Sequence, residues 1–132
     1  MLLSLALIGS APFLLDTCEG SGTPAPEPPT GVGEDLFMTG DDFQCITQGE
    51  KVRSFYLWNE LGHLDEALEV ANNPRGGTYP IGTVLQLIPS EAMVKRYEGF
   101  SPESNDWEYF YLEVEETGTT VLDRGATNPA GP

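Results

Sequence analysis

The distribution of apolar residues divides the chain into three stretches. Residues 2–15 (LLSLALIGSAPFLL) carry no charge, and residues 18–33 hold few side chains that could fill a core. From residue 34 onward, short apolar runs recur between polar turns that are rich in Gly, Pro and Asn. Runs of this length predict the strands and helices of one small domain over residues 34–132.

Most of the apolar runs in this domain are typical of strands. They combine β-branched and aromatic residues, and polar turn residues bound them. Residues 34–50 are polar with a few apolar anchors, which predicts an irregular segment or one short helix. The predicted strands are 52–58, 83–88, 92–97, 107–114 and, after a hairpin turn at 115–118, 119–123.

Residues 63–72 show a helical period instead. Acidic residues lie early in this segment, where the helix dipole favours them, and Asn72-Asn73-Pro74 ends it. The predicted fold class is therefore α+β, a small antiparallel sheet with one helix packed on it. The apolar stripe of the helix has the spacing i, i+3, i+4, i+7 and consists of Leu64, Ala67, Leu68 and Ala71.

The strand predicted at 107–114 alternates between two faces. Phe110 lies on the same side as Leu112 and Val114, whereas Trp107 lies on the other side. Alternation of this kind predicts a half-buried antiparallel strand. We expect the side that carries Phe110 to face the core.

Residues 1–17 are predicted to be an export signal. The apolar run at 2–15 is too short to cross a bilayer, and Pro12 interrupts it. It matches the hydrophobic part of a signal peptide, although no Lys or Arg precedes it. Residues 18–33 are predicted to be a Pro/Gly-rich linker. These features predict an extracytoplasmic protein, in the periplasm or at the cell surface.

The two cysteines, Cys18 and Cys45, are compatible with three kinds of processing. Leu15 lies three residues before Cys18, as in bacterial lipoproteins, but Asp16-Thr17 is an unusual pair directly before a lipidated cysteine. Lipidation of Cys18 would give a membrane anchor. A disulfide between Cys18 and Cys45 and ordinary signal cleavage nearby are equally compatible with the sequence. Two cysteines are too few for a disulfide framework or a structural zinc site.

The charge of the domain limits its partners. Three of the 21 acidic residues precede residue 34, so 18 acids and 6 bases give residues 34–132 a net charge of −12. Such a domain repels nucleic acid and anionic lipid and attracts cationic proteins or metal ions, so the expected protein partner is a cationic or a redox protein. Five acids, which lack the spacing of a calcium loop, are expected to form a solvated rim: Glu91, Glu98, Glu103, Asp106 and Glu108.

No sequence motif indicates a hydrolase or a nucleotide-binding protein. The chain has no nucleophile elbow, no phosphate-binding loop and no HExxH motif. His63, the one histidine, suits the start of the predicted helix as well as it suits a general base. We therefore assign no catalytic residue and no metal ligand.

The segment from Tyr79 to Asn128 resembles the haem domain of the cytochrome P-460 family and its relative cytochrome c′-beta. The matching pieces are a Y-P-x-G-T strand start, M-V-K-R, a polar loop running into D-W-E-x-F, and a Gly-Thr turn before the last strand. Counted from Asn59, the resemblance covers about seventy residues. It implies a β-sheet that holds a c-type haem.

In that family, the haem is bound covalently by a C-x-x-C-H motif near the C-terminus, with the His on the iron. Some members add a lysine cross-link and oxidise hydroxylamine, and others bind nitric oxide or similar gases. The resemblance implies Lys95 as the cross-linking lysine and Trp107 and Phe110 as haem contacts. The competing interpretation places Lys95 at the surface beside Arg96 and gives the aromatic residues a purely structural core role.

The chain departs from the family pattern because it contains no C-x-x-C-H. It is expected to be either a fragment cut before the motif, which we favour, or a relative that lost haem. The expected function is that of an exported P-460-like domain, whose family uses haem c in small-nitrogen redox or gas binding. The alternative is a haem-free surface lipoprotein with a binding or structural role. The chain as printed is expected to carry no cofactor, and to be oxidoreductase-like only in a haem-bearing form.

Overall fold

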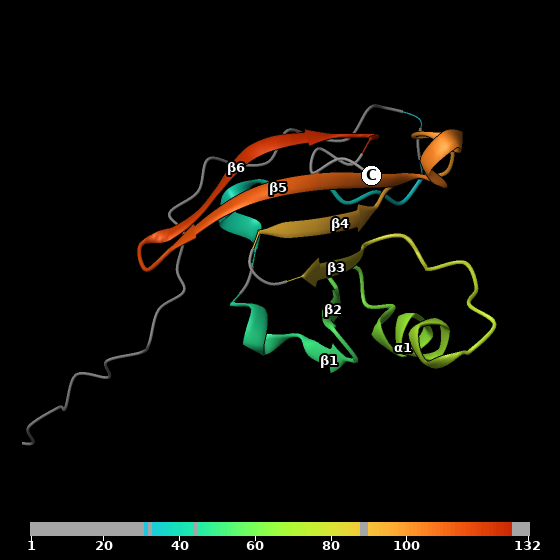
Figure 1. Ribbon diagram of the computed structural model, residues 1–132. Helices are drawn as coiled ribbons and strands as arrows, with labels where there is room; N and C mark the ends of the chain where they lie inside the picture. The colour runs from blue at the N-terminus through green and yellow to red at the C-terminus, as the bar shows by residue number, and fades with distance from the viewer. Residues whose placement is uncertain (1–30, 32, 44, 88–89, 128–132) are drawn as a thin grey trace, which may run out of the picture.

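The computed structural model describes residues 31, 33–43, 45–87 and 90–127, so the predicted signal, most of the linker and Cys18 lie outside the described residues. The described residues form one six-stranded antiparallel sheet in which each strand pairs with the next in sequence (Figure 1). The sheet contains β1 Glu50–Val52, β2 Phe55–Asn59, β3 Thr83–Leu87, β4 Glu91–Lys95, β5 Trp107–Glu115 and β6 Gly118–Gly125.

The helical elements of this part of the chain are one α-helix and three short 3-10 helices. They are α1 Leu64–Asn72, η1 Gly40–Asp42, η2 Ile46–Gln48 and η3 Pro102–Ser104. The prediction of an antiparallel sheet with one helix is thus confirmed, with sheet as the larger part. None of the described helices is long and apolar enough to cross a membrane.

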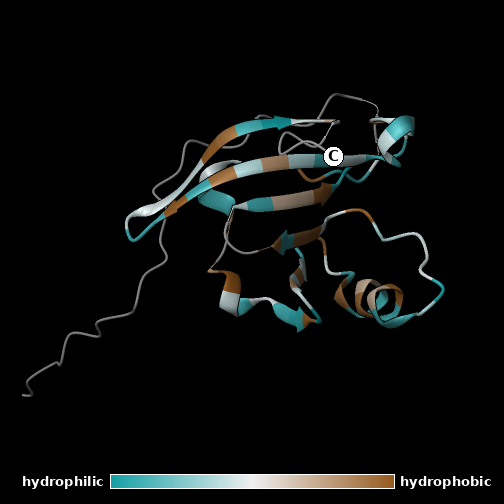
Figure 2. Cartoon of the chain, in the orientation of Figure 1, coloured by the Kyte–Doolittle hydropathy of each residue, from teal (hydrophilic) through white to brown (hydrophobic). Residues whose placement is uncertain are grey.

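The two faces of the sheet bury separate hydrophobic clusters, because successive side chains of a strand point to opposite sides. Figure 2 shows bands of hydrophobic and hydrophilic residues along β5, whereas β3, which is buried on both sides, is largely hydrophobic. One face, which we call the helix face, packs Leu57 and Leu85 against α1. The other, the strap face, packs Trp58, Val84 and Phe110 against the N-terminal strap, residues 33–43.

The helix packs through the predicted stripe. Ala67 and Ala71 are fully buried against the helix face, and Leu64 and Leu68 pack beside them. The helix begins after His63, so the predicted span of 63–72 is confirmed to within one residue.

The strand predicted at 52–58 is confirmed only over residues 55–58, which belong to β2, because the chain turns at Arg53 and Ser54. Val52 pairs with Phe55 at the end of a β1–β2 hairpin, and Arg53 in the turn has a φ of +53°. Two-residue hairpin loops need such left-handed backbone, and Asn-Gly is their usual signal. Arg-Ser in place of Asn-Gly gave no such signal. The Arg53 guanidinium donates to the carbonyl oxygen of Ala71 at 2.7 Å, which joins the hairpin to the end of α1.

The β5–β6 hairpin confirms the predicted inner face only near its base. Phe110 and Leu112 are each 1% exposed, whereas Val114 is 54% exposed. The reason is that β4 pairs with β5 only as far as Tyr111, so the end of the hairpin runs beyond the rest of the sheet.

The N-terminal strap is extended backbone with a short 3-10 turn, and it covers the strap face. Met38 and Phe43 are buried there, and the Phe43 ring meets the Phe110 ring edge-on at 5.2 Å. Gly40 lies directly against β6, where an added Cβ would stand 2.2 Å from the carbonyl oxygen of Thr119. Only glycine allows this approach, so η1 can rest on the sheet.

Candidate functional site

A cavity of about 380 Å³ lies on the helix face. Lys95 and Trp107 are cross-strand partners on β4 and β5, which places both side chains on this face. The Tyr79 ring meets the Trp107 ring edge-on, with centroids 5.5 Å apart. The cavity is lined by Gly77, Thr78, Tyr79, Lys95, Asn105 and Trp107.

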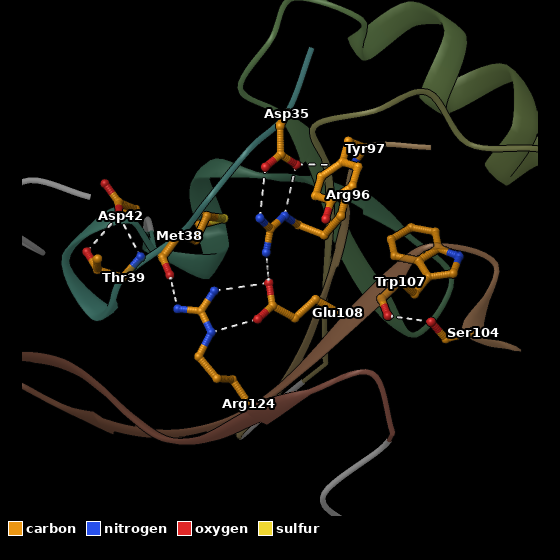
Figure 3. Close-up of polar contacts among 10 residues, drawn as sticks. All are labelled: Asp35, Met38, Thr39, Asp42, Arg96, Tyr97, Ser104, Trp107, Glu108 and Arg124. Atoms are coloured by element: carbon orange, nitrogen blue, oxygen red, sulfur yellow. Dashed lines mark hydrogen bonds and ion pairs between the residues drawn. The ribbon is translucent and has the colours of Figure 1, made fainter. Parts of the chain in front are cut away.

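Two loops hold the cavity walls. The loop that leads from α1 to β3 brings Tyr79 to the cavity, and the amide of Gly82 at its end donates to the carbonyl oxygen of Lys95 at 2.9 Å. The loop before β5 brings Asn105, which has a φ of +54°. The Ser104 hydroxyl donates to the carbonyl oxygen of Trp107 at 2.8 Å and fixes this second loop on the strand (Figure 3).

Lys95 is the charged group of the cavity, and only 8% of the residue is exposed. Its ammonium donates to the carbonyl oxygen of Asn105 and lies 5.6 Å from the centroid of the Trp107 ring. Burial lowers the pKa of Lys95 below its ordinary value, and the charge of Asp106 opposes this shift in part. Burial also raises the pKa of Tyr79, although the charge of Arg53 acts to lower it.

A second polar centre lies on the strap face. Arg96 donates through Nε and Nη2 to the Asp35 carboxylate at 2.9 and 2.8 Å, and through Nη1 to Glu108 (Figure 3). Arg124 donates through Nε and Nη2 to Glu108 at 2.7 and 3.0 Å. Its Nη1 donates to the carbonyl oxygen of Met38 at 2.7 Å. We call Asp35, Arg96, Glu108 and Arg124 the charge network.

The charge network fastens the strap to the sheet. Two arginines and two carboxylates balance each other, so the network adds no net charge to the core. The Asp35, Arg96 and Glu108 side chains are at most 6% exposed, and Arg124 is 26% exposed. Burial would raise the pKa of Asp35, but the hydrogen bonds and charge of Arg96 outweigh it and lower this pKa. The guanidiniums already bind partners, which indicates a structural role.

The structure brings together two of the three residues that the resemblance implied as haem contacts. Lys95 and Trp107 line one cavity, whereas Phe110 lies on the opposite face in the core. The surface position considered for Lys95 is wrong, because its neighbours Trp107 and Asn105 cover it. Trp107 is half-buried and packs against the hydrophobic cluster of the helix face, which agrees with the predicted structural role at the edge of the core.

The predicted acidic rim divides into different environments. Glu98 and Glu103 are exposed as expected, and Glu91 is half-buried. Asp106 accepts hydrogen bonds from the amides of Gly99 and Ser101. Glu108 is buried in the charge network, so its placement in a solvated rim is wrong. Across the described ranges, no group of three or more His, Cys, Asp or Glu side chains could hold a metal ion.

Two of the remaining candidates, His63 and Cys45, are not among the residues that line the cavity. His63 Nε2 lies 2.9 Å from the Glu34 carboxylate at the surface. The hydrogen bond to Glu34 raises the pKa of His63 above its ordinary value. Cys45 is disulfide-bonded, and lipidation of Cys18 stays a prediction because Cys18 lies outside the described residues.

Sequence patterns did not predict the charge network. Its members come from distant segments, because Asp35 and Arg96 are 61 positions apart in the sequence. Arg124 is likewise 86 positions from Met38, whose carbonyl oxygen it binds. One signal was present: the alternation of β5 places Glu108 on the same side as Phe110. An acidic residue on the expected inner face indicates a buried partner of opposite charge.

No family model, curated protein or solved structure matches this chain.

Proposed function

We propose that this chain is the β-sheet domain of an exported cytochrome of the P-460 type, with its haem-facing wall at the Lys95 cavity. The family that it resembles binds haem c for redox chemistry of small nitrogen compounds or for gas binding. The proposed location is outside the cytoplasm, on the strength of the apolar segment at 2–15 and the linker that follows it.

The observation that carries the proposal is the pairing of Lys95 with Trp107. The resemblance implied both residues as haem contacts, and they share one cavity on the helix face. A buried amine beside two aromatic rings is suited to contact with a large planar group. The six-stranded antiparallel sheet also agrees with the β-sheet that the resemblance implies.

The residues present meet only part of what a c-type haem requires. The cavity wall can contact a haem through two aromatic rings and one amine, those of Trp107, Tyr79 and Lys95. Thioether attachment requires two cysteines beside an axial histidine. His63 pairs with Glu34 outside the cavity lining, and Cys45 is disulfide-bonded. The printed chain thus does not fit covalent haem, and we derive no catalytic step for it.

Haem maturation in an export-competent host tests the proposal. The printed chain is co-expressed with the cytochrome c maturation machinery, and the purified, denatured protein is examined as its pyridine haemochrome. We expect no haem c signal, because the thioether-forming cysteines are lacking. The same test is applied to the chain extended along its reading frame through any C-x-x-C-H within about 20 residues.

The two arms give distinct answers. A stoichiometric haem c signal that appears only in the extended protein supports the cytochrome proposal, and Trp107→Ala should then alter its visible spectrum. A stop codon directly after Pro132 would overturn it. The runner-up is a haem-free surface protein with a binding or structural role, favoured by the fact that the sheet buries a hydrophobic cluster on each face with its own side chains.

A further inference from the structure

We infer that the Lys95 cavity binds a small monocarboxylate that carries a flat apolar body, such as an aromatic acid. The inference concerns the folded chain without haem and goes beyond the proposed function. It rests on the charge of Lys95, the donors that its ammonium retains, and the shape and chemistry of the cavity walls.

Lys95 is a buried cation that forms no ion pair with a carboxylate in the described part of the chain. Arg96 and Arg124, the other cations that reach the sheet interior, each bind carboxylates. Lys95 instead contacts a carbonyl oxygen and a ring face, and the Asp106 carboxylate acts on it only from beyond ion-pair distance. A buried charge is stabilised when a group of opposite charge reaches it. An anion in the cavity would supply that charge.

The Lys95 ammonium has hydrogen-bonding capacity left. It carries three donors, and one of them is directed to the carbonyl oxygen of Asn105. A carboxylate beside it would accept a charge-assisted hydrogen bond, which is stronger than a neutral one. The side chain of Thr78 in the cavity lining adds a hydroxyl group.

The aromatic walls of the cavity favour a flat, apolar ligand body. The Trp107 and Tyr79 rings form one corner of the cavity, with ring planes inclined at 68°. A flat ring can stack on one of them and meet the edge of the other, as aromatic groups prefer. The cavity of about 380 Å³ falls within the usual range of small-molecule sites.

The negative charge of the domain limits how many charges the ligand can carry. The domain carries a net charge of −12, and Asp106 acts on Lys95 electrostatically. This repulsion acts on each of the several negative charges of a polyphosphate or dicarboxylate, whereas a monocarboxylate has only one. A single buried ammonium therefore favours a singly charged ligand.

Calorimetric titration with benzoate tests the inference on the printed chain. We expect saturable binding to the wild-type protein, and binding of neutral benzamide about tenfold weaker or less, because it lacks the charge-assisted bond. Lys95→Met should weaken benzoate binding by about the same factor. Lys51→Met is the matched control, since Lys51 also lies near an aromatic ring, 5.9 Å from the Tyr56 centroid, but on the exposed surface.

Circular dichroism and urea unfolding establish that Lys95→Met is folded before it is titrated. Removal of a buried charge that has no carboxylate partner should leave the fold intact. Should Lys95→Met fail to fold, Trp107→Leu and the comparison of benzoate with benzamide still decide the matter. Equal affinity for benzoate and benzamide, an equal effect of Lys51→Met, or no binding overturns the inference. Haem attachment to the extended protein without benzoate binding to the printed chain would uphold the proposed function and overturn this inference alone.

Discussion

Burial of a residue in this domain depends on the face of the strand that it occupies and on how far along the strand it lies. Phe110 and Val114 point to the same side of β5, yet one is buried and the other exposed. Phe110 packs edge-on against Phe43 and lies under the Arg124 guanidinium, 4.7 Å from its ring centroid. Val114 lies beyond the last residue that β4 pairs with.

We predict that Phe110→Ala lowers the free energy of unfolding by ~3–5 kcal/mol, the usual cost of deleting a fully buried ring. Urea denaturation measures the change. Val114→Ala on the same side of the strand is the control and should stay within ~0.5 kcal/mol. If both substitutions cost the same, the packing of the strap face described above is incorrect.

The buried acid of the charge network acts through several partners at once. Glu108 accepts hydrogen bonds from both Arg96 and Arg124, and these arginines hold the strap through Asp35 and the Met38 carbonyl. Loss of its charge would leave two guanidiniums competing for one carboxylate in a buried site. Such losses cost more than the paired state contributes.

We predict that Glu108→Gln costs about 3–5 kcal/mol in unfolding free energy, the range for breaking a buried pair by altering one partner. Glu98→Gln, at an exposed position ten residues earlier, should change stability by less than ~0.5 kcal/mol. Chemical denaturation of both variants is compared at neutral pH. A cost for Glu108→Gln equal to that of the control would show that the network does not secure the strap.

Ion pairs to other elements also hold the start of the strap in place. Glu34 at its beginning pairs with His63, which precedes α1, while Asp35 turns inward to Arg96. Adjacent residues of one segment thus contact the helix start and the opposite face of the sheet. The contact with α1 depends on the charge of the one histidine.

We predict that the His63 ring titrates with a pKa above its ordinary value of 6.5, because Glu34 accepts a hydrogen bond from the protonated ring. Its folded pKa is raised, so the pair stabilises the fold fully below the unfolded pKa. That contribution is lost as pH rises through the folded pKa. NMR titration of the ring protons in wild type and Glu34→Gln gives the test.

Glu34→Gln should bring the titration midpoint of His63 back toward 6.5. As the control, Glu69→Gln, elsewhere on α1, should leave this midpoint raised. Stability of the wild type should then fall between slightly acidic and mildly alkaline pH, and that fall should shrink in Glu34→Gln. An identical midpoint in both proteins would contradict the pairing.

On the scale of the whole molecule, the folded unit begins at the strap. Asp35, Met38 and Phe43 supply an ion pair and two buried side chains to the strap face. The Pro/Gly-rich stretch before residue 34 cannot bury a core of its own. The strap is therefore expected to belong to the domain, and the linker is not.

We predict that limited proteolysis of the full chain leaves a stable fragment that starts near residue 34, within the wider range of 34–50 that the sequence indicates. A chain that starts at residue 32 should unfold at the same urea concentration as the full chain, with reductant present in both. A chain that starts at residue 44 should be much less stable, because it lacks Asp35, Met38 and Phe43. A fold that depends on residues 2–15 would refute this.

The sequence alone determined the features that arise from local periodicity. The helix at 63–72 and the alternation on 107–114 follow from repeats of 3.6 and 2 residues, which neighbouring side chains already display. The strand predicted at 83–88, which the structure gives as Thr83–Leu87, follows from β-branched residues bounded by turn residues. The same patterns predicted the sheet-plus-helix class and the burial of Phe110. The hairpin at Arg53 was not predicted, because its turn residues lack the usual Asn-Gly signal.

Only the tertiary structure decided which distant residues meet. Strand register placed Lys95 on β4 directly opposite Trp107 on β5, a pairing that the alternation within either strand does not specify. The fold of the strap over β5 and β6 brought Asp35 to Arg96 across 61 residues. The cost of burying a charge depends on partners that long-range packing supplies, and local sequence patterns do not specify those partners.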